Sequence, residues 1–408
     1  MEYTHRYPAH PTQEVAAELE HHIDIHRQAY NYARYEYTHL DADSTGSAYK
    51  HHSRLPDWKD EFPVFTEVNA KALQRTVTRF YDNLSNLSQQ KENGNKVGKL
   101  KWKSPREFQS ITYSQHGFKL KNTSGRRATL WLSKIGDIPI RYHRPLPDEA
   151  DIKEVSVKKE TTGEWFVSFA LETDETDLPE KPDVDSLDAS NSVGIDLGIL
   201  SYIHTSDGQI VDWLDLEDEY DRLRREQRKL SRKQKESSNY EKQRREVAKV
   251  KRHIKRKVED FQHKITTWLV REYDAVFVED LNVKGMLEDS HNARNTQAAA
   301  WRQFITLLEY KAELYGTHVV QVEAARTTKE CAKCGVETTK SIWVREHSCP
   351  SCGFEADRDA NAALNVLKRG FSELGLGWPE DTPVETALPT DTYSVSAKRV
   401  VEAGSLGA

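Results

Sequence analysis

Two pairs of cysteines constrain this chain more than any other feature of its sequence. Cys331 and Cys334 form one Cys-x2-Cys pair, Cys349 and Cys352 form a second, and 14 residues separate the two pairs. Each pair makes a tight turn, and a glycine follows each second cysteine, where a positive φ is favoured. Two such turns direct four thiolates toward one point, which is the tetrahedral shell that Zn²⁺ prefers. The spacing therefore predicts a structural zinc site.

A redox-active Cys-x2-Cys motif and a pair of disulfides are the competing interpretations of these residues. The sequence has no run of the roughly 18 apolar residues that a membrane span requires. No apolar segment typical of a signal peptide follows Met1. We therefore expect neither a membrane protein nor a secreted disulfide scaffold, but a cytoplasmic chain with reduced thiols. A closed four-cysteine shell needs no fifth ligand, so His347 is expected at the surface.

The charge of the chain is unevenly distributed. Its 408 residues include 59 Lys and Arg against 65 Asp and Glu, a net charge of −6. Residues 222–257 hold 17 basic and 4 acidic side chains, which leaves 42 basic and 61 acidic residues elsewhere, a net charge of −19. A basic element on an acidic body predicts binding to a polyanion. The acidic remainder is also typical of a protein that stays soluble in high salt.

The basic stretch has a helical pattern. Its apolar residues recur every three or four positions, at Val247, Val250, Ile254, Val258, Phe261 and Ile265. The candidate nucleic-acid contacts lie off this stripe or in the helix before it: Arg224, Arg225, Arg228, Arg244, Arg245, Lys251, Arg252, Lys255 and Arg256. A solvated helical hairpin is the alternative. The excess of one sign is too large for mutual ion pairing, which favours phosphate contact.

The first part of the chain has a helical pattern that is followed by a strand pattern. Residues 12–90 have helical periodicity, with a polar loop expected over 41–57. His22 and His26, four positions apart on the first helix, are expected to be a surface pair. Residues 100–171 contain short alternating segments and turn residues, which predict a small β-barrel.

An acidic, proline-containing segment from Glu172 to Ser190 marks the expected domain boundary, because eight acidic residues accompany a single lysine there. After it we expect strands over 193–197, 200–204 and 210–213, helices over 217–272, a strand over 275–279, a helix over 298–315, a strand over 317–322, the cysteine module and a helix over 359–368. The remainder, 371–408, is expected to be disordered.

Three acidic residues stand out in this second part. Asp196 follows Val-Gly-Ile in an apolar strand, Glu279 ends the strand Val276–Val278, and Asp359 begins a helix. A buried carboxylate in an apolar strand costs free energy unless a cation offsets its desolvation. Three converging carboxylates are able to bind two Mg²⁺ ions that clamp a phosphodiester. Singly, each residue also fits a turn residue or a helix cap. Two neighbouring aspartates are expected to lie outside the group, because Asp280 should point away from Glu279 on the extended segment and Asp357 is a candidate cap of the helix.

In combination these motifs resemble the TnpB (OrfB) family, the transposon-encoded ancestor of the type V CRISPR effectors. The resemblance rests on Gly194–Gly198, Val278–Asn282, Trp301–Gly316, Thr327–Gly335, Cys349–Gly353 and Asp357–Ala363, with Leu132–Gly136 and His143-Arg144 upstream. It covers about residues 5–370.

The resemblance implies a multidomain α/β protein that also contains a β-barrel. The implied parts are a wedge barrel (1–10 and 100–172) with an inserted helical recognition domain (11–99), an acidic linker (173–191), an RNase H-like, RuvC-type nuclease domain (192–324 and 357–370) with an inserted zinc ribbon (325–356), and a disordered tail (371–408).

It also implies an RNA-guided, magnesium-dependent DNA endonuclease of an insertion sequence. Asp196, Glu279 and Asp359 are then the catalytic residues and magnesium ligands, with zinc at the cysteines. The implied partners are a guide RNA from the transposon end, target double-stranded DNA and a separate transposase, with no membrane, in the nucleoid-associated cytoplasm.

Two other functions compete with cleavage. One is a non-cleaving, zinc-containing nucleic-acid-binding regulator of transposition. The presence of all three acidic residues that the resemblance implies argues against it. The other is DNA strand transfer, which the family resemblance disfavours because a partner transposase usually moves the DNA.

Overall fold

The computed structural model describes residues 2–114, 116–148, 150–174, 178–198, 201–281, 292–339, 344–377 and 394–395. The chain divides into two compact units. The first contains Met1–Asp177 with Arg244–Ala248, and the second contains Leu178–Gln243 with Lys249–Ala408. The division after Asp177 falls within the acidic segment that the sequence marks as a boundary. None of the helices in the described ranges is long and apolar enough to cross a membrane.

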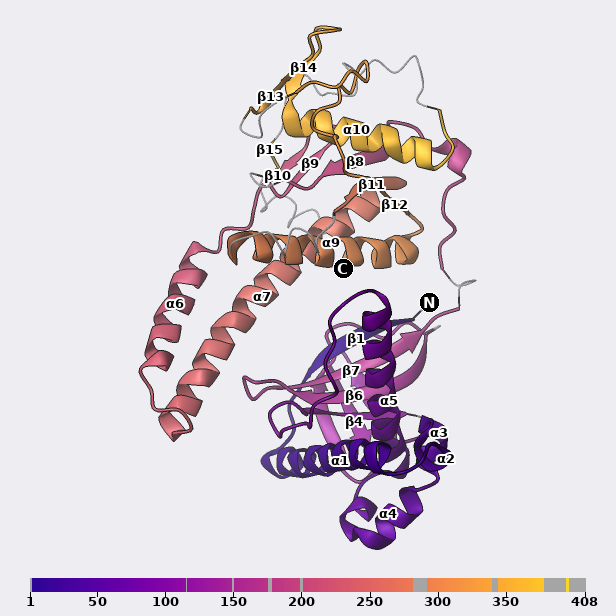
Figure 1. Ribbon diagram of the computed structural model, residues 1–408, viewed down its shortest axis with the longest axis vertical. Coiled ribbons are helices and arrows are strands. Elements are labelled where there is room, and N and C mark those ends of the chain that lie inside the picture. Colours follow the sequence, from indigo (N-terminus) through magenta and orange to yellow (C-terminus); the bar gives the residue numbers. More distant parts are fainter. Residues whose placement is uncertain are drawn as a thin grey trace. The chain divides into compact units, whose positions relative to one another are not determined.

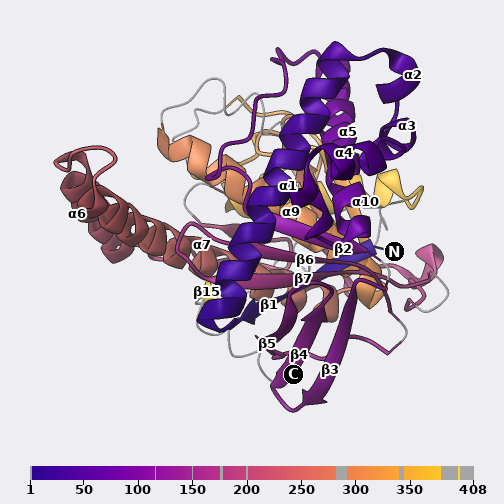
Figure 2. The same ribbon diagram turned by 90° about the horizontal axis from the view of Figure 1, so that it is seen from below.

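The first unit is built on one curled antiparallel sheet (Figure 2). Its strands are β1 (Glu2–Ala9), β2 (Ser110–Ser114), β3 (Phe118–Ser124), β4 (Arg127–Leu132), β5 (Gly136–Arg141), β6 (Asp151–Lys159) and β7 (Trp165–Glu172). They lie in the order β2-β6-β7-β1-β5-β4-β3, with β2 and β3 at the two edges. The first strand of the chain therefore lies inside the sheet, between β7 and β5.

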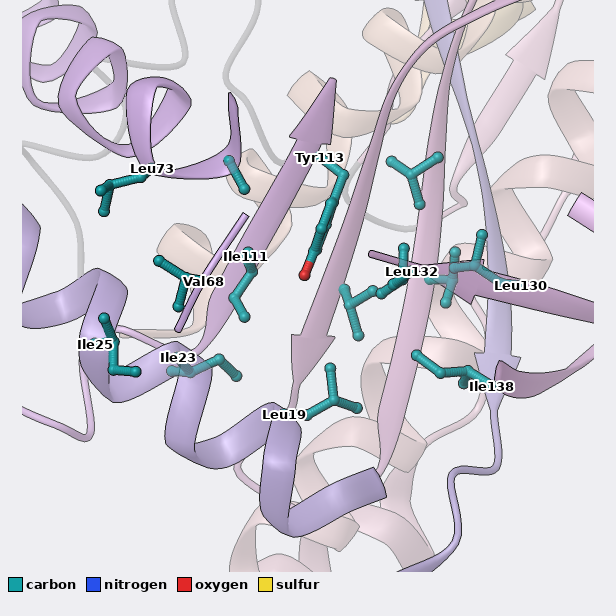
Figure 3. Close-up of a cluster of buried hydrophobic side chains, with 14 of the residues drawn as sticks. Leu19, Ile23, Ile25, Val68, Leu73, Ile111, Tyr113, Leu130, Leu132 and Ile138 are labelled. Carbon is teal, nitrogen blue, oxygen red and sulfur yellow. The ribbon is translucent and has the colours of Figure 1, made fainter. Parts of the chain in front are cut away.

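Two long helices pack against this sheet. α1 (Gln13–His39) begins after Thr12, whose side chain accepts a hydrogen bond from the Val15 amide (3.3 Å). α5 (Ala70–Glu92) begins after Asn69, which caps it in the same way. Figure 3 shows the shared core, to which the helices contribute Leu19, Ile23 and Leu73 and the strands contribute Ile111, Tyr113, Leu130, Leu132 and Ile138.

The segment between these helices is not the polar loop that was expected over 41–57. It contains α2 (Ala42–Thr45), α3 (Ala48–His52), α4 (Leu55–Glu61) and the 3-10 helix η1 (Pro63–Thr66). The buried carboxylate of Glu36 accepts hydrogen bonds from His51 Nε2 (2.9 Å), Arg54 Nε (3.0 Å) and Trp58 Nε1 (2.9 Å). The expectation was wrong because it relied on hydrophobic periodicity. This segment is ordered by hydrogen bonds to a buried carboxylate, which such a pattern does not reveal.

The histidine pair on α1 also differs from expectation. His22 and His26 are 1% and 0% exposed, so the predicted surface pair is buried. His26 Nδ1 lies 2.7 Å from the Thr76 hydroxyl of α5, which gives this histidine a polar partner inside the helix pair.

The second unit contains a mixed sheet of six strands. They are β8 (Ser192–Asp196), β9 (Ile203–Thr205), β10 (Ile210–Val211), β11 (Ala275–Asp280), β12 (His318–Glu323) and β15 (Ser394–Val395), in the order β12-β11-β8-β9-β10-β15. β8, β11 and β12 run parallel, whereas β9 is antiparallel to β8. β15 lies within the tail that was expected to be disordered, and the rest of that tail beyond residue 377 is outside the described residues.

Side-chain alternation gives the two faces of this sheet different partners. Val193 and Ile195 of β8 pack with α7 (Ser238–Glu272) and α9 (Asn292–Tyr315). On the opposite face, Phe277 of β11 packs with α10 (Arg358–Glu373). Figure 1 shows α10 as the yellow helix that lies over the sheet. Period-two alternation therefore places Gly194, Asp196 and Glu279 on the face that α10 covers.

A close approach of backbones seats α10 on this face. A Cβ at Gly194 would overlap the Ala363 carbonyl oxygen and stand 2.5 Å from the Leu367 amide nitrogen. A Cβ at Gly370 would likewise overlap the Phe277 ring. Backbone atoms of a buried helix cannot rotate away, so these two glycines set the depth at which α10 lies.

We expect Gly194→Ala to destabilise the second unit by about 3 kcal/mol, since overpacking a rigid contact costs this much. The measurements are urea denaturation of the whole chain and hydrogen exchange over residues 358–373. Gly377→Ala is the matched control, because no described atom lies within 4 Å of its added Cβ. Equal stability of the two variants would contradict the close approach.

Candidate active site

The four cysteines form one cluster in the second unit. Their sulfur atoms lie within 4.8 Å of one another, with Cys331 Sγ 3.7 Å from Cys352 Sγ and Cys334 Sγ 3.5 Å from Cys349 Sγ. Sulfurs at 2.3 Å from a tetrahedral zinc stand about 3.8 Å apart, so the cluster fits the ion. Disulfide bonds, at about 2.05 Å, are absent among these four residues.

The two cysteine turns have the same backbone geometry. Gly335 and Gly353 adopt φ values of +73° and +72°. Their amides donate to the carbonyls of Cys331 (2.8 Å) and Cys349 (3.0 Å). β13 (Glu346–Ser348) and β14 (Glu355–Asp357) form a short hairpin around the second turn. The prediction for His347 was wrong, since this residue of β13 is fully buried.

Adjacent parallel strands bring two of the predicted acidic residues together. Asp196 ends β8, and the pairing of Val278 with Ile195 places Glu279 beside it. Asp359 lies in the first turn of α10, on the same face of the sheet. Asp196, Glu279 and Asp359 are 6%, 5% and 3% exposed. The structure therefore gathers three buried carboxylates that are distant in the sequence.

Burial and nearby negative charge raise the pKa values of two of these carboxyl groups, Asp196 and Glu279. Burial, followed by the charges of Glu279 and Asp359, raises the pKa of Asp196 well above its ordinary value. Burial raises the pKa of Glu279 to about 7, although a hydrogen bond from Thr327 opposes the change. Both carboxylates are therefore costly to ionise in the folded protein. A divalent cation would remove this cost, so the donor set fits Mg²⁺.

The three carboxylates are neighbours rather than the ligands of a single ion. Within the described ranges, their oxygens do not all lie within 4.8 Å of one another. The ions of a two-metal site stand about 3.5–4 Å apart, so carboxylates that serve such a pair are spread more widely than the ligands of one ion.

Two arginines lie against Asp359. Arg345, which precedes β13, donates to Asp359 Oδ2, and its side chain is 35% exposed. Arg358 Nε lies 3.4 Å from Asp359 Oδ1. These guanidinium groups offset the negative charge of Asp359 and connect it to the cysteine module.

The two neighbouring aspartates behave as the sequence suggested. Asp280 is exposed and follows Glu279 on β11, so its side chain points to the other face. Asp357 caps α10, because its Oδ1 accepts hydrogen bonds from the amides of Asp359 (2.8 Å) and Ala360 (3.4 Å). Neither carboxylate belongs to the group of three.

Sequence analysis gave no role to several residues that lie around the acidic group. Thr327 donates its hydroxyl hydrogen to Glu279 Oε1 (2.6 Å), and its carbonyl accepts from Asn365 Nδ2 (2.8 Å). His204, on β9, pairs with Asp196 in the sheet register. Thr327 was part of the stretch that carried the resemblance, so a signal existed. No local pattern links residues 204, 345 and 365 to the acidic group, since only packing brings them there.

The basic stretch forms a helical hairpin, most of which belongs to the second unit. α6 (Glu217–Ser231) precedes α7, and Gln243 Nε2 of α7 donates to Glu226 Oε2 of α6 (2.6 Å). No residue of α6 is buried. Of the nine predicted nucleic-acid contacts, Arg224, Arg225, Arg228, Arg245, Lys251, Lys255 and Arg256 are exposed, whereas Arg244 and Arg252 are partly covered.

A second basic segment was missed. Residues 96–106 contain five basic and no acidic residues, with Trp102 52% exposed among them. α1 holds this segment, because Asn31 exchanges two hydrogen bonds with the Lys103 backbone (2.8 and 3.0 Å). The Arg34 guanidinium lies 4.2 Å from the Trp102 ring centre. Basic residues alternating with an aromatic were a signal that the sequence offered.

Comparisons with known proteins agree on one family. Residues 172–290 match the family described as probable transposase (OrfB_IS605), and residues 301–366 match the Cas12f1-like TNB domain. A putative RNA-guided DNA endonuclease of Streptomyces pristinaespiralis is 32% identical over 381 residues, which cover 91% of this chain and 90% of the relative. The putative RNA-guided DNA endonuclease InsQ of Escherichia coli (strain K12) is 25% identical, with 81% and 84% covered.

Solved structures show the same relationship at the level of the fold. The Cas12f1 chain of an sgRNA–target DNA complex superposes with a TM-score of 0.55 at 17% identity, covering 87% of this chain and 83% of that one. CasPhi-2 (Cas12j) bound to crRNA gives a TM-score of 0.52 at 10% identity, with 93% and 99% covered. With a relative 32% identical along nearly the whole length, the chain belongs to the TnpB (OrfB) family.

Proposed function

We propose that this protein is an RNA-guided, magnesium-dependent DNA endonuclease that cleaves phosphodiester bonds at a RuvC-type two-metal site. One observation carries the proposal: Asp196, Glu279 and Asp359 are buried together on one face of the sheet. A buried group of like charges is costly unless cations bind it. Relatives named as putative RNA-guided DNA endonucleases support the same activity.

Each acidic residue has a distinct role in this proposal. Bound Mg²⁺ would supply charge for the attacking water and the leaving oxygen of the phosphodiester. Asp196 and Asp359 would hold the cations, and Glu279 would complete the ligand shell and orient the attacking water. The Thr327 hydroxyl fixes Glu279 Oε1, so one carboxylate orientation is favoured before substrate binds. The partly exposed Arg345 side chain would have to turn toward solvent for a cation to reach Asp359 Oδ2.

Hydrogen bonds connect the cysteine module to α10, the helix that carries Asp359. Asn361 and Asn365 of α10 donate to the Glu330 carbonyl (2.8 and 2.7 Å), directly before Cys331. Asn361 Oδ1 also accepts from the Ala332 amide (3.0 Å). Zinc bound at the cysteines therefore orders the loop that carries Thr327 toward Glu279.

Nucleic acid would be held by positive charge outside the acidic site. The exposed arginines and lysines of α6 and α7 contact phosphates of the guide RNA and of target double-stranded DNA in this proposal. Sequence recognition is left to base pairing by a guide RNA from the transposon end. A separate transposase as partner and action on nucleoid DNA in the cytoplasm belong to the same proposal.

A non-cleaving regulator of transposition is the second candidate. It is favoured by the pairing of Asp359 with Arg345, which gives this carboxylate a partner without a metal. Plasmid cleavage with Mg²⁺ or with EDTA, using protein that retains its own RNA, separates the two. The plasmid carries a target matched to the RNA sequenced from the purified protein.

We expect Asp196→Asn to reduce plasmid cleavage by at least about 10³-fold, since it removes a ligand of the cations that stabilise the transition state. Binding of RNA and target DNA should remain within about threefold of the wild type. Asp280→Asn is the matched control, because this neighbouring carboxylate is exposed. Cleavage that persists in Asp196→Asn would remove the basis of the proposed function.

The same substitution should stabilise the metal-free protein. The pKa values of Asp196 and Glu279 are raised in the folded state, so their contribution is favourable at low pH and is lost as pH rises past about 4.5 toward 7 and above. In Mg²⁺-free buffer at pH 8, with the zinc retained, Asp196→Asn should gain about 1 kcal/mol, or roughly 2–4 °C in Tm. The gain should shrink at pH 5. A lower Tm than wild type at pH 8 would show that the carboxylates do not repel one another.

Loss of one cysteine should remove the zinc. Cys334→Ser is expected to lower bound zinc from one equivalent to below about 0.2, because a three-thiolate shell binds the ion far less tightly. Elemental analysis measures the metal, and hydrogen exchange over 325–339 and 344–356 measures the loosening. Ser351→Ala keeps all four sulfurs and serves as control. A wild-type protein without zinc would contradict the assignment.

A further inference from the structure

A buried histidine lies beside the acidic site and has no assigned role. His204 is 3% exposed, and its Nε2 atom has no hydrogen-bond partner among the residues that the structure describes. A buried polar atom without a partner costs about 1–3 kcal/mol. The position therefore calls for an explanation beyond packing.

The histidine belongs to a compact group of potential metal ligands. One ring nitrogen of His204 and one carboxylate oxygen each of Asp357 and Asp359 all lie within 4.8 Å of one another. His204 Nδ1 is 3.9 Å from Asp357 Oδ1. Ligands of one ion at about 2.1 Å stand up to about 4.2 Å apart, so side-chain movements of under about 1 Å bring the three atoms into range.

The backbone fixes this placement. β9 is antiparallel to β8, and His204 is paired directly with Asp196. Paired residues of antiparallel strands project from the same face, with Cβ atoms about 4.5–5.5 Å apart. Asp357 and Asp359 lie at the start of α10, which covers that face. The imidazole therefore borders the acidic site on the side away from Glu279, which lies on β11.

We propose that His204, Asp357 and Asp359 form a divalent-cation site that shares Asp359 with the nuclease site and prefers a transition-metal ion to Mg²⁺. Mg²⁺ favours an all-oxygen shell, whereas imidazole nitrogen is a ligand for first-row transition metals. The inference rests on the proposed function only for its shared residue, because metal binding by His204 does not require cleavage.

Three contacts compete with such an ion, and one of them is Arg358 Nε, 3.4 Å from Asp359 Oδ1. Arg345 occupies Asp359 Oδ2, but its partly exposed side chain can turn to solvent. Asp357 uses Oδ1 to cap α10, which leaves Oδ2 for a cation. His204 Nδ1 is the ring nitrogen near Asp357 Oδ1, so it would bind the ion while Nε2 carries the proton.

The experiment uses the whole chain with its zinc retained, freed of RNA and of other metals, and Mn²⁺ alone as the probe. Electron paramagnetic resonance of free Mn²⁺ gives the affinity, and electron spin-echo modulation reports nitrogen bound directly to the ion. The wild type should show ¹⁴N modulation. His204→Ala should lose it and bind Mn²⁺ about 10–100-fold more weakly, with Mg²⁺ affinity changed by less than about threefold.

A second variant, Asp357→Asn, tests whether weaker Mn²⁺ binding comes from a lost ligand or from misfolding. Asparagine caps helices as well as aspartate does, so α10 stays intact while a carboxylate ligand is lost. This variant should also weaken Mn²⁺ binding about 10-fold, and Asp280→Asn should not change it. Absence of ¹⁴N modulation in the wild type, or its survival in His204→Ala, would overturn the proposal.

These outcomes are separate from those that test cleavage. Persistent cleavage in Asp196→Asn removes the proposed function but leaves the nitrogen signal of His204 intact. Loss of the signal without loss of Mg²⁺-dependent cleavage in His204→Ala supports the transition-metal site and leaves the nuclease proposal standing.

Discussion

The seating of α10 on β8 is the contact on which the second unit depends. It is a contact between backbones, because Gly194 presents no side chain to the Ala363 carbonyl or the Leu367 amide. A helix seated this deeply carries Asp359 to the level of the strand ends. The acidic group is thus a consequence of close packing as much as of the acidic residues themselves.

This packing places three carboxylates together in one poorly solvated region. Carboxylates that would be harmless on a surface become expensive when a helix covers them, and the raised pKa values of Asp196 and Glu279 express that cost. Arginine, threonine and asparagine side chains offset part of it. Arg345 neutralises Asp359, and Thr327 satisfies Glu279. Asn361 and Asn365 of α10 form hydrogen bonds with the backbone next to Cys331, so the cysteine cluster is connected to the helix that carries Asp359.

Sequence patterns were reliable where the physical signal was local. The Cys-x2-Cys turns, the helical stripe of α7 and the cap at Asp357 all depend on residues within a few positions of one another. They were unreliable where a polar group was buried by distant elements. His22, His26 and His347 were expected at the surface and are buried, and the loop over 41–57 is ordered around the carboxylate of Glu36.

The sequence by itself determined the family, the cysteine turns and which acidic residues lie in apolar strands or at a helix start, because each depends on composition or short spacing. Only the tertiary structure decided that residues 196, 279 and 359 share one covered face. It also placed His204, Thr327 and Arg345 around them. The reason is that sheet register and helix seating bring together residues more than 80 positions apart, such as Asp196 and Glu279, and no local pattern encodes that distance.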